Sequence, residues 1–237
     1  MLIYTKYRSD EPEIMDDFAM EGEILRDALY KIAKINQLLG GNQLTLQSVQ
    51  DLIVNIHKQS EIVIADIGCG NGDMLRTLSN FGLKNNLNFR LIGIDANNFT
   101  IKHAQSLSEN YPNIKYRCED VFEKNFADLK YDIVLCTLTL HHFKDDEIIQ
   151  LMSVFNANSR VGIVINDLHR SAIAYRLFQV LCFVFQLNAI SREDGLVSIL
   201  RGFKKEDLIK FSKKLSFTNY KIQWKWAFRY QWIVKKE

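Results

Sequence analysis

Five short apolar runs alternate with segments of helical periodicity in the middle of the chain. They read IVIADI, FRLIGID, IKYRCED, YDIVLCT and RVGIVIND, starting at Ile62. Strands that alternate with helices form a parallel sheet covered by helices on both faces. Residues 204–215 predict one more helix, and the alternating segment YKIQWKWAFRYQWIVKK predicts a closing hairpin. The sequence therefore predicts an α/β fold with a doubly wound sheet.

Two amphipathic helices are expected before this core. From Glu13 to Leu39 apolar residues recur at spacings of three and four, and a pair of glycines ends the pattern. A second helix is expected to start at Thr45, which suits an N-cap. We assign residues 1–60 to an N-terminal helical extension and residues 61–237 to the main domain.

A helical insertion of about residues 168–203 is expected after the fifth strand. Its segment AYRLFQVLCFVFQL is apolar on most faces, but a membrane helix needs ~20 mainly apolar residues, and Arg176 and Gln179 interrupt the run. We expect a lid over a binding site and no membrane span, because this insertion projects from the carboxyl edge of the sheet. Its aromatic side chains would form an apolar inner face, and polar ones near its start are candidates for ligand contacts: Phe178, Phe183 and Phe185, then Arg170, Tyr175 and Arg176.

Charge is distributed unevenly, although the net charge is only +2. Residues 201–237 hold eleven Lys and Arg residues against three acidic ones, a net charge of +8, so the rest of the chain carries −6. A basic tail can bind phosphates, but lysines also protect sheet edges from pairing with other chains, and we favour this second reading. The four cysteines show no paired spacing and the N-terminus no export signal, so we expect a cytoplasmic protein.

The segment VIADIGCGNGDMLRTL carries the strongest motif. Asp66, Gly68, Gly70 and Gly72 occupy alternate positions between a predicted strand and a predicted helix. Glycine permits a tight turn and lets backbone amides approach a ligand that a Cβ would exclude. Dinucleotide sites use the different spacing G-x-G-x-x-G, and Asp66 would repel a pyrophosphate. The loop therefore favours a cationic, amine-bearing ligand.

Acidic residues also end the next two strands. Asp95, in LIGIDAN, is placed to accept hydrogen bonds from ribose hydroxyls. Asp120, in CEDVF, can accept from an adenine amino group, and Val121 or Phe122 can form an apolar wall for the ring. Each residue alone could be a helix cap, a solvated loop residue or core. Together they indicate a nucleoside site, because ligands of open α/β sheets bind at the carboxyl ends of the strands.

The series D-x-G-x-G-x-G, D-A-N, E-D-V and YDIVLCTLTLHHF resembles class I S-adenosylmethionine (SAM)-dependent methyltransferases over about residues 62–167, in particular their ubiquinone and menaquinone biosynthesis branch. The segments PEIMDD, INQLLGG, NDLHRSAIAYRLF and DGLVSILRGF resemble a bacterial small-molecule subfamily of that branch, associated with aromatic polyketide or quinone-like products. The resemblance implies a Rossmann-like sheet of seven strands with the last strand antiparallel, and SAM as cofactor. The residues it implies around SAM are Asp66, Gly68, Gly70, Asp95, Ala96, Asp120, Val121 and Thr137.

Methyl transfer needs alignment of the reactants and, for an acidic acceptor, a base. Histidines at the ends of the fourth and fifth strands are the candidates: His141, His142 and His169. A neutral imidazole can take a phenolic proton. The adjacent pair could instead bind a metal, but side chains of neighbouring strand residues diverge, and no suitable Cys or carboxylate set joins them. We therefore predict no metal site and expect one of the pair to be structural.

The predicted function is transfer of a methyl group from SAM to a small-molecule acceptor, at oxygen or a ring carbon of an aromatic, polyketide or quinone-like compound. The alternative is an RNA or protein methyltransferase that uses the basic C-terminal hairpin. Base amino-group methylases carry a D/N-P-P-Y type motif after the fourth strand, where this chain has Thr137 to His142 instead. Nucleic acid is therefore the disfavoured partner, and the sequence does not determine the oligomeric state.

Overall fold

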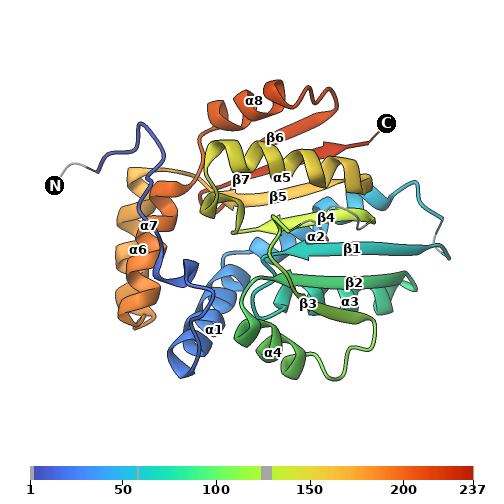
Figure 1. Cartoon of the computed structure of the whole chain (residues 1–237), viewed down its shortest axis with the longest axis horizontal. Helices are drawn as coiled ribbons and strands as arrows, with labels where there is room; N and C mark the ends of the chain where they lie inside the picture. The colour runs from blue at the N-terminus through green and yellow to red at the C-terminus, as the bar shows by residue number, and fades with distance from the viewer. Residues whose placement is uncertain (1–2, 58, 124–129, 237) are drawn as a thin grey trace.

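A computed structural model describes residues 3–57, 59–123 and 130–236. Its strands form one seven-stranded sheet in the order β3-β2-β1-β4-β5-β7-β6 (Figure 1). Strand β7 runs antiparallel to both of its neighbours, and the pairs among β1 to β5 are parallel. The predicted fold class is therefore confirmed. The strands are β1 Glu61–Ile67, β2 Asn88–Asp95, β3 Ile114–Cys118, β4 Tyr131–Thr137, β5 Ser159–Leu168, β6 Tyr220–Lys225 and β7 Arg229–Lys235.

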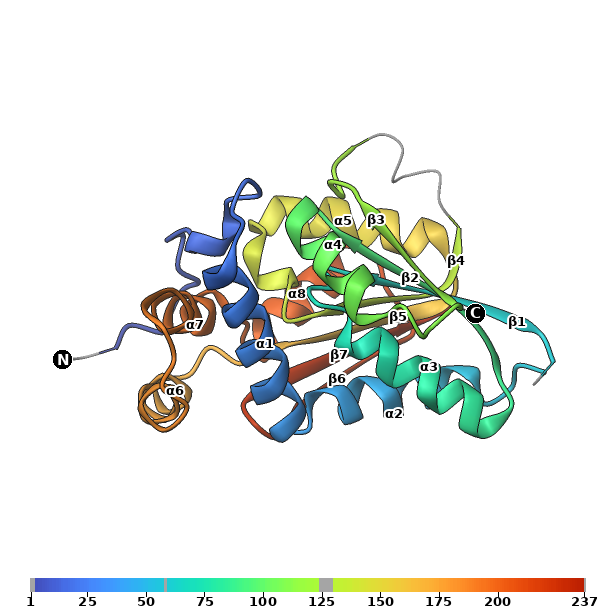
Figure 2. The same cartoon turned by 90° about the horizontal axis from the view of Figure 1, so that it is seen from below.

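Two hydrophobic clusters cover the two faces of the sheet, because successive side chains of a strand point to opposite sides. In β1, Val63 and Ala65 join the cluster under α5 and α8, whereas Ile62 and Ile64 join the cluster under α2 and α3. Figure 2 shows α2 and α3 on one side of the sheet and α5 on the other. These helices are α2 Gly41–Ile53, α3 Asp73–Asn85, α4 Asn98–Leu107, α5 Asp145–Asn158 and α8 Lys205–Lys214.

The insertion after β5 is a pair of helices, α6 (Ala172–Val184) and α7 (Ala189–Arg201). Its two ends are tied together, because the amide of Phe203 donates to the carbonyl of Leu168 at 2.8 Å and the amide of Arg170 donates to the carbonyl of Phe203 at 3.0 Å. The helices therefore project from the carboxyl edge of the sheet as one unit (Figure 1). Each helix among the described residues is too short or too polar to span a membrane.

The N-terminal helices differ from the prediction in their bounds. The prediction of a single helix from Glu13 to Leu39 was wrong, because a short 3-10 turn, η1 (Ile14–Asp16), precedes the separate helix α1 (Glu23–Leu38). Tertiary contacts override the helical periodicity here, because the amides of Ile14 and Met15 donate to the Asp194 carboxylate of α7. Helix α2 begins at Gly41 and not at Thr45, which is buried.

One predicted helix is missing from the described residues. Helices were expected between all five parallel strands, but residues 119–123, which follow β3, contain none. The rest of that connection includes residues 124–129, which lie outside the described residues. The basic C-terminal segment forms α8 and the β6–β7 hairpin, with β6 at the edge of the sheet. Lysines on this edge strand fit the expected protection against edge pairing.

Candidate active site

A cavity of about 1710 Å³ lies at the carboxyl edge of the parallel strands. Pockets for one small ligand commonly measure roughly 300–1,000 Å³, so this cavity has room for two ligands. Its walls come from the glycine loop after β1, the ends of β2 to β5, the N-terminal segment and the helices α1, α6 and α7. All eight residues expected around SAM line it: Asp66, Gly68, Gly70, Asp95, Ala96, Asp120, Val121 and Thr137.

The glycine loop adopts backbone angles that other residues rarely reach. Gly68, Gly70 and Gly72 have φ values of +67°, +51° and +77°. A Cβ at Gly68 would lie 2.3 Å from the side chain of Thr139, whereas a Cβ at Gly70 would meet nothing closer than Leu29 Cδ2 at 3.8 Å. Gly70 therefore presents bare backbone to the open cavity, and Gly72 serves as the N-cap of α3.

Two carboxylates lie beside this loop. Asp66 is only 3% exposed, and its burial, together with the carboxylates of Asp73 and Asp95, raises its pKa well above the ordinary value. A cationic ligand group would relieve this unfavourable charge. Asp95 accepts hydrogen bonds from the amides of Gly70 at 3.1 Å and Asn97 at 3.0 Å, so it also shapes the loop. Each of its oxygens keeps a lone pair for a further donor, and its role at ribose stays a prediction.

The end of β3 supplies the next wall of the cavity. Asp120 closes a turn by accepting from the amide of Phe122 at 2.9 Å. The Phe122 ring packs edge-on against Phe143, with ring centroids 5.6 Å apart, and Val121 packs against the core under α5. These residues form an apolar wall with one carboxylate at its rim, and their role at adenine stays a prediction. On the neighbouring strand β4, the hydroxyl of Thr137 lies 3.3 Å from that of Thr45.

His141 and His142 lie side by side, with ring centroids 4.4 Å apart. The expectation that they diverge along a strand was wrong, because they belong to a 3-10 turn, η3 (Leu140–His142), that follows β4. Nδ1 of His141 lies 2.7 Å from Asp167 Oδ1, and Nδ1 of His142 lies 2.6 Å from Asp16 Oδ1. His141 is buried, whereas His142 lines the cavity.

Both carboxylates of these pairs are held in the ionised form. Burial raises the pKa of Asp16, but the hydrogen bonds from His142 and Arg201 lower this pKa by more, so it lies below its ordinary value. Burial also raises the pKa of Asp167, but the charge and the hydrogen bond of His141 lower it by more, so the pKa lies below its ordinary value. An ionised carboxylate only accepts hydrogen bonds, so Nδ1 of each imidazole carries a proton and Nε2 of the neutral ring carries a lone pair.

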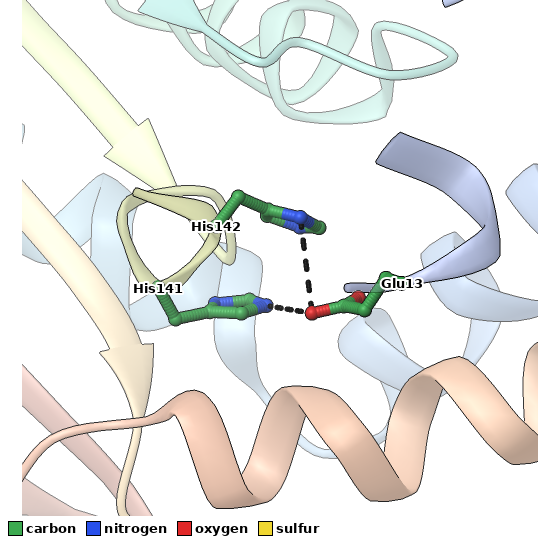
Figure 3. Close-up of side chains that lie close together, drawn as sticks. All are labelled: Glu13, His141 and His142. Atoms are coloured by element: carbon green, nitrogen blue, oxygen red, sulfur yellow. Dashed lines mark ion pairs between the residues drawn. The ribbon is translucent and has the colours of Figure 1, made fainter. Parts of the chain in front are cut away.

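A third carboxylate, that of Glu13, approaches both histidines (Figure 3). Its Oε1 lies 3.6 Å from His141 Nε2 and 3.8 Å from His142 Nδ1. Its Oε2 accepts a hydrogen bond from Ser198 Oγ at 2.6 Å, which fixes the side chain. The reasoning that no carboxylate joins the histidines was therefore wrong. Glu13 and Asp16 lie far from the strand ends in sequence, and the segment PEIMDD was the only sequence signal for them.

His169 also lines the cavity but differs in its hydrogen bonding. Its Nδ1 lies 3.2 Å from Nε1 of Trp224, and an indole N–H can only donate. The neutral imidazole therefore carries its proton on Nε2. Burial, reinforced by Lys204 and Arg170, lowers the pKa of His169. This geometry suits a hydrogen-bond donor to a ligand and not a base.

The inner wall of the insertion is apolar, but its composition differs from the prediction. Phe178 lines the cavity, whereas Phe183 is 86% exposed and points away from the protein. The expected ligand contacts of three polar residues were wrong, since Arg170, Tyr175 and Arg176 are absent from the described cavity lining. Arg170 is buried and binds the carbonyl of Gly202 and the carboxylate of Asp207, so it anchors the insertion.

Arg229 is a further cavity residue that the sequence did not reveal. It lies at the start of β7 and is buried, and burial lowers its pKa to about 10. Nε and Nη1 have no hydrogen-bond partner among the described residues. A buried guanidinium with free N–H groups is suited to an anionic ligand group.

Comparisons with known proteins agree with this geometry. Residues 64–162 match a family model described as "Methyltransferase domain", which covers less than half of the chain. No curated protein matches significantly.

Three similar solved structures illustrate the likeness in fold. The magnesium protoporphyrin IX methyltransferase ChlM from Synechocystis PCC 6803, with bound SAM, is 14% identical with a TM-score of 0.56, over 94% of this chain and 89% of that one. The plantazolicin methyltransferase BpumL, bound to S-adenosylhomocysteine (SAH), is 17% identical with a TM-score of 0.65, over 88% and 89%. The CurJ carbon methyltransferase is 15% identical with a TM-score of 0.62, over 82% and 53%.

Residues 64–162 are thus similar to methyltransferase domains, and the similar structures confirm the fold. Of these similar proteins, ChlM contains SAM and BpumL contains SAH. Neither finding singles out the ubiquinone and menaquinone branch.

Proposed function

We propose that this protein transfers a methyl group from SAM to oxygen or a ring carbon of a small, largely apolar acceptor. One observation carries the proposal. A single cavity joins the glycine loop and the carboxylates Asp66 and Asp95 to His142 and the apolar face of α6. It therefore offers a cofactor wall and an acceptor wall that face the same space.

The residues around the glycine loop fit SAM. Bare backbone at Gly70 leaves room for the ligand, and the buried carboxylate of Asp66 lacks a cation that the amino group of SAM would provide. SAM supplies an electrophilic methyl group on a positively charged sulfur. Asp95 would bind the ribose, Asp120 and Val121 the adenine, and Ala96 and Thr137 would complete the wall.

His142 is the group we assign to the acceptor proton. Asp16 holds the proton of His142 on Nδ1, so Nε2 is free to accept one from an acceptor hydroxyl. The acceptor oxygen then forms the new bond to the methyl carbon, and the electron pair of the broken carbon–sulfur bond stays on sulfur. His141, buried behind it, positions the turn, and His169 would donate a hydrogen bond to the acceptor.

Aromatic, polyketide or quinone-like compounds are the acceptor class we favour. The face of α6 that lines the cavity presents Phe178 and Leu181, which suit a flat or long apolar molecule. The similar proteins named above, for magnesium protoporphyrin IX and plantazolicin, act on molecules other than nucleic acid, which agrees with a small-molecule acceptor. The resemblance to quinone-biosynthesis enzymes points in the same direction.

Two measurements test the proposal. Isothermal titration calorimetry should detect one SAM site, and Asp95→Asn should weaken it by about ten-fold or more, since a charge-assisted hydrogen bond contributes ~1.5–3 kcal/mol. The protein, incubated with SAM and a panel of phenols, hydroquinones and polyketide-like rings, should release SAH. No SAM binding by the folded protein would refute the cofactor assignment. SAH release with RNA or protein and with no member of the small-molecule panel would favour the alternative acceptor.

A further inference from the structure

We propose that Glu13, His141 and His142 form a binding site for one divalent transition-metal cation at the acceptor end of the cavity. Figure 3 shows the three side chains converging from η3 and from the segment before η1. One ligand atom of each lies within 4.8 Å of the others. Two histidines and one carboxylate are a common ligand set for Zn²⁺ and for Fe²⁺.

Unpartnered polar atoms are the first observation behind this site. Glu13 Oε1 and His141 Nε2 are buried, and neither has a hydrogen-bond partner in the described part of the chain. Their side chains are 4% and 2% exposed. Buried polar atoms are nearly always paired, so two facing atoms without partners indicate a missing group between them. Glu13 Oε1 and His141 Nε2 can each donate a lone pair, and one cation between them would accept both lone pairs.

The spacing of the ligand atoms is the second observation. In a tetrahedral zinc site with bonds of about 2.0–2.1 Å, neighbouring ligand atoms lie roughly 3.3–3.4 Å apart. Glu13 Oε1 lies 3.6 Å from His141 Nε2 and 3.8 Å from His142 Nδ1. A closure of a few tenths of an ångström therefore brings Glu13 Oε1 and His141 Nε2 to coordination distance. His142 can join them only after its Nδ1 gives up the proton directed at Asp16 or its ring turns to present Nε2.

Surrounding hydrogen bonds hold the ligands in the required form. Asp167 fixes the proton of His141 on Nδ1 and leaves Nε2 as a lone pair toward Glu13. Such carboxylate–histidine pairs orient the imidazole and raise its basicity in metal sites. Ser198 holds the other oxygen of Glu13, so Oε1 is the oxygen that faces the two histidines.

The charge of the cluster suits a divalent cation. Glu13, Asp16 and Asp167 place three carboxylates beside the two imidazoles, and the guanidinium of Arg201 forms ion pairs with Glu13 and Asp16. Arg201 hydrogen-bonds Asp16 at 2.7 Å and lies 3.6 Å from Glu13 Oε1, so its charge is directed mainly to Asp16.

The site also faces the cavity. Glu13 and His142 both line it, so three protein ligands leave a coordination position open toward the acceptor. A cation there can bind an acceptor oxygen and lower the pKa of its hydroxyl, and the two imidazoles then act as ligands. This catalytic consequence rests on the proposed function, whereas the binding of the cation does not.

Calorimetric titration of the tag-free full chain with ZnCl₂ tests the site. We expect one saturable site per chain, and we expect Co²⁺ to give the visible absorption bands of a tetrahedral nitrogen–oxygen site. Glu13→Gln and His142→Ala should each weaken Zn²⁺ binding at least ten-fold. Glu11→Gln removes an exposed carboxylate of the same segment, and His103→Gln removes a histidine of α4, so both should bind as the wild type does.

Circular dichroism shows whether each variant folds, and His142, which is less buried than His141, provides a second variant if Glu13→Gln unfolds. Absence of saturable Zn²⁺ binding by the wild type would overturn the site. Equal affinity of the wild type and both folded site variants would overturn it too. SAM titration of the same samples separates the two proposals, since a chain that binds SAM and no Zn²⁺ lacks only the cation site.

Discussion

Oδ1 of Asp16 lies 2.6 Å from Nδ1 of His142, which joins the N-terminal segment to the turn after β4. The carboxylate is ionised and can only accept, so this contact decides which imidazole nitrogen carries the proton. The nitrogen left with a lone pair is Nε2, and His142 is the histidine of η3 that lines the cavity. The N-terminal segment thereby takes part in the candidate active site.

His142→Gln should lower the turnover of a hydroxyl acceptor by about 10²-fold or more, since a positioned base contributes typically 10²–10⁴-fold. SAM affinity should stay within a factor of about two, because the base faces the acceptor. Single-turnover assays of SAH formation together with calorimetry check both values. His103→Gln on α4 is the matched control. Unchanged turnover in His142→Gln would remove His142 from the reaction.

Asp66→Asn should stabilise the ligand-free protein and weaken SAM binding. Burial and neighbouring carboxylates raise the pKa of Asp66, so the folded protein holds this proton more tightly than the unfolded chain. The proton on Asp66 stabilises the folded protein fully at pH below 3.8, the ordinary pKa of this carboxyl. This stabilisation is lost as pH rises through the raised pKa. The variant should therefore melt at a higher temperature than the wild type at neutral pH, with a difference that shrinks toward pH 3.8.

Thermal melts across this pH range measure that difference, with Asp51→Asn on the exposed side of α2 as control. A cation–carboxylate contact with SAM also requires ionised Asp66. Wild-type SAM affinity should accordingly fall as pH drops through the raised pKa, and the affinity of Asp66→Asn should change less. Equal pH dependence in both proteins would contradict the assignment of Asp66 to a cationic group.

Gly70→Ala and Gly68→Ala should separate ligand exclusion from structural damage. Both residues have positive φ, which costs a non-glycine residue about 1–2 kcal/mol. A Cβ at Gly70 enters open cavity, so this variant should fold and lose most SAM affinity. A Cβ at Gly68 meets Thr139 at 2.3 Å, so this variant should melt at a lower temperature than Gly70→Ala. Normal SAM binding by Gly70→Ala would mean that the cofactor lies elsewhere.

Phe178→Ala should raise the KM of an apolar acceptor, since it removes part of the cavity wall on α6. Tyr175→Ala on the same helix lies outside the cavity lining and should leave KM unchanged. Steady-state kinetics with one acceptor compare the two variants. The reverse pattern would place the acceptor on the other side of α6, where Tyr175 and Arg176 lie.

Local sequence patterns were enough to predict the sheet and the position of the glycine loop. Apolar runs with period two and amphipathic helices are local patterns, so the alternation from Ile62 onward predicts the parallel strands. The carboxyl ends of parallel strands meet at one edge of a sheet, so the sequence alone predicts that Asp66, Asp95 and Asp120 lie at one site. In the structure all three line the same cavity.

The surroundings of the histidines depend on long-range tertiary contacts that the sequence patterns did not predict. The η3 turn places His141 beside His142, and residues at the start of the chain deliver Glu13 and Asp16 to them. A further long-range contact breaks the helical pattern that starts at Glu13, because the Asp194 carboxylate of α7 accepts hydrogen bonds from the amides of Ile14 and Met15. Pairings between residues so far apart in sequence leave no periodic signal, since long-range hydrogen bonds depend on packing and not on local propensity.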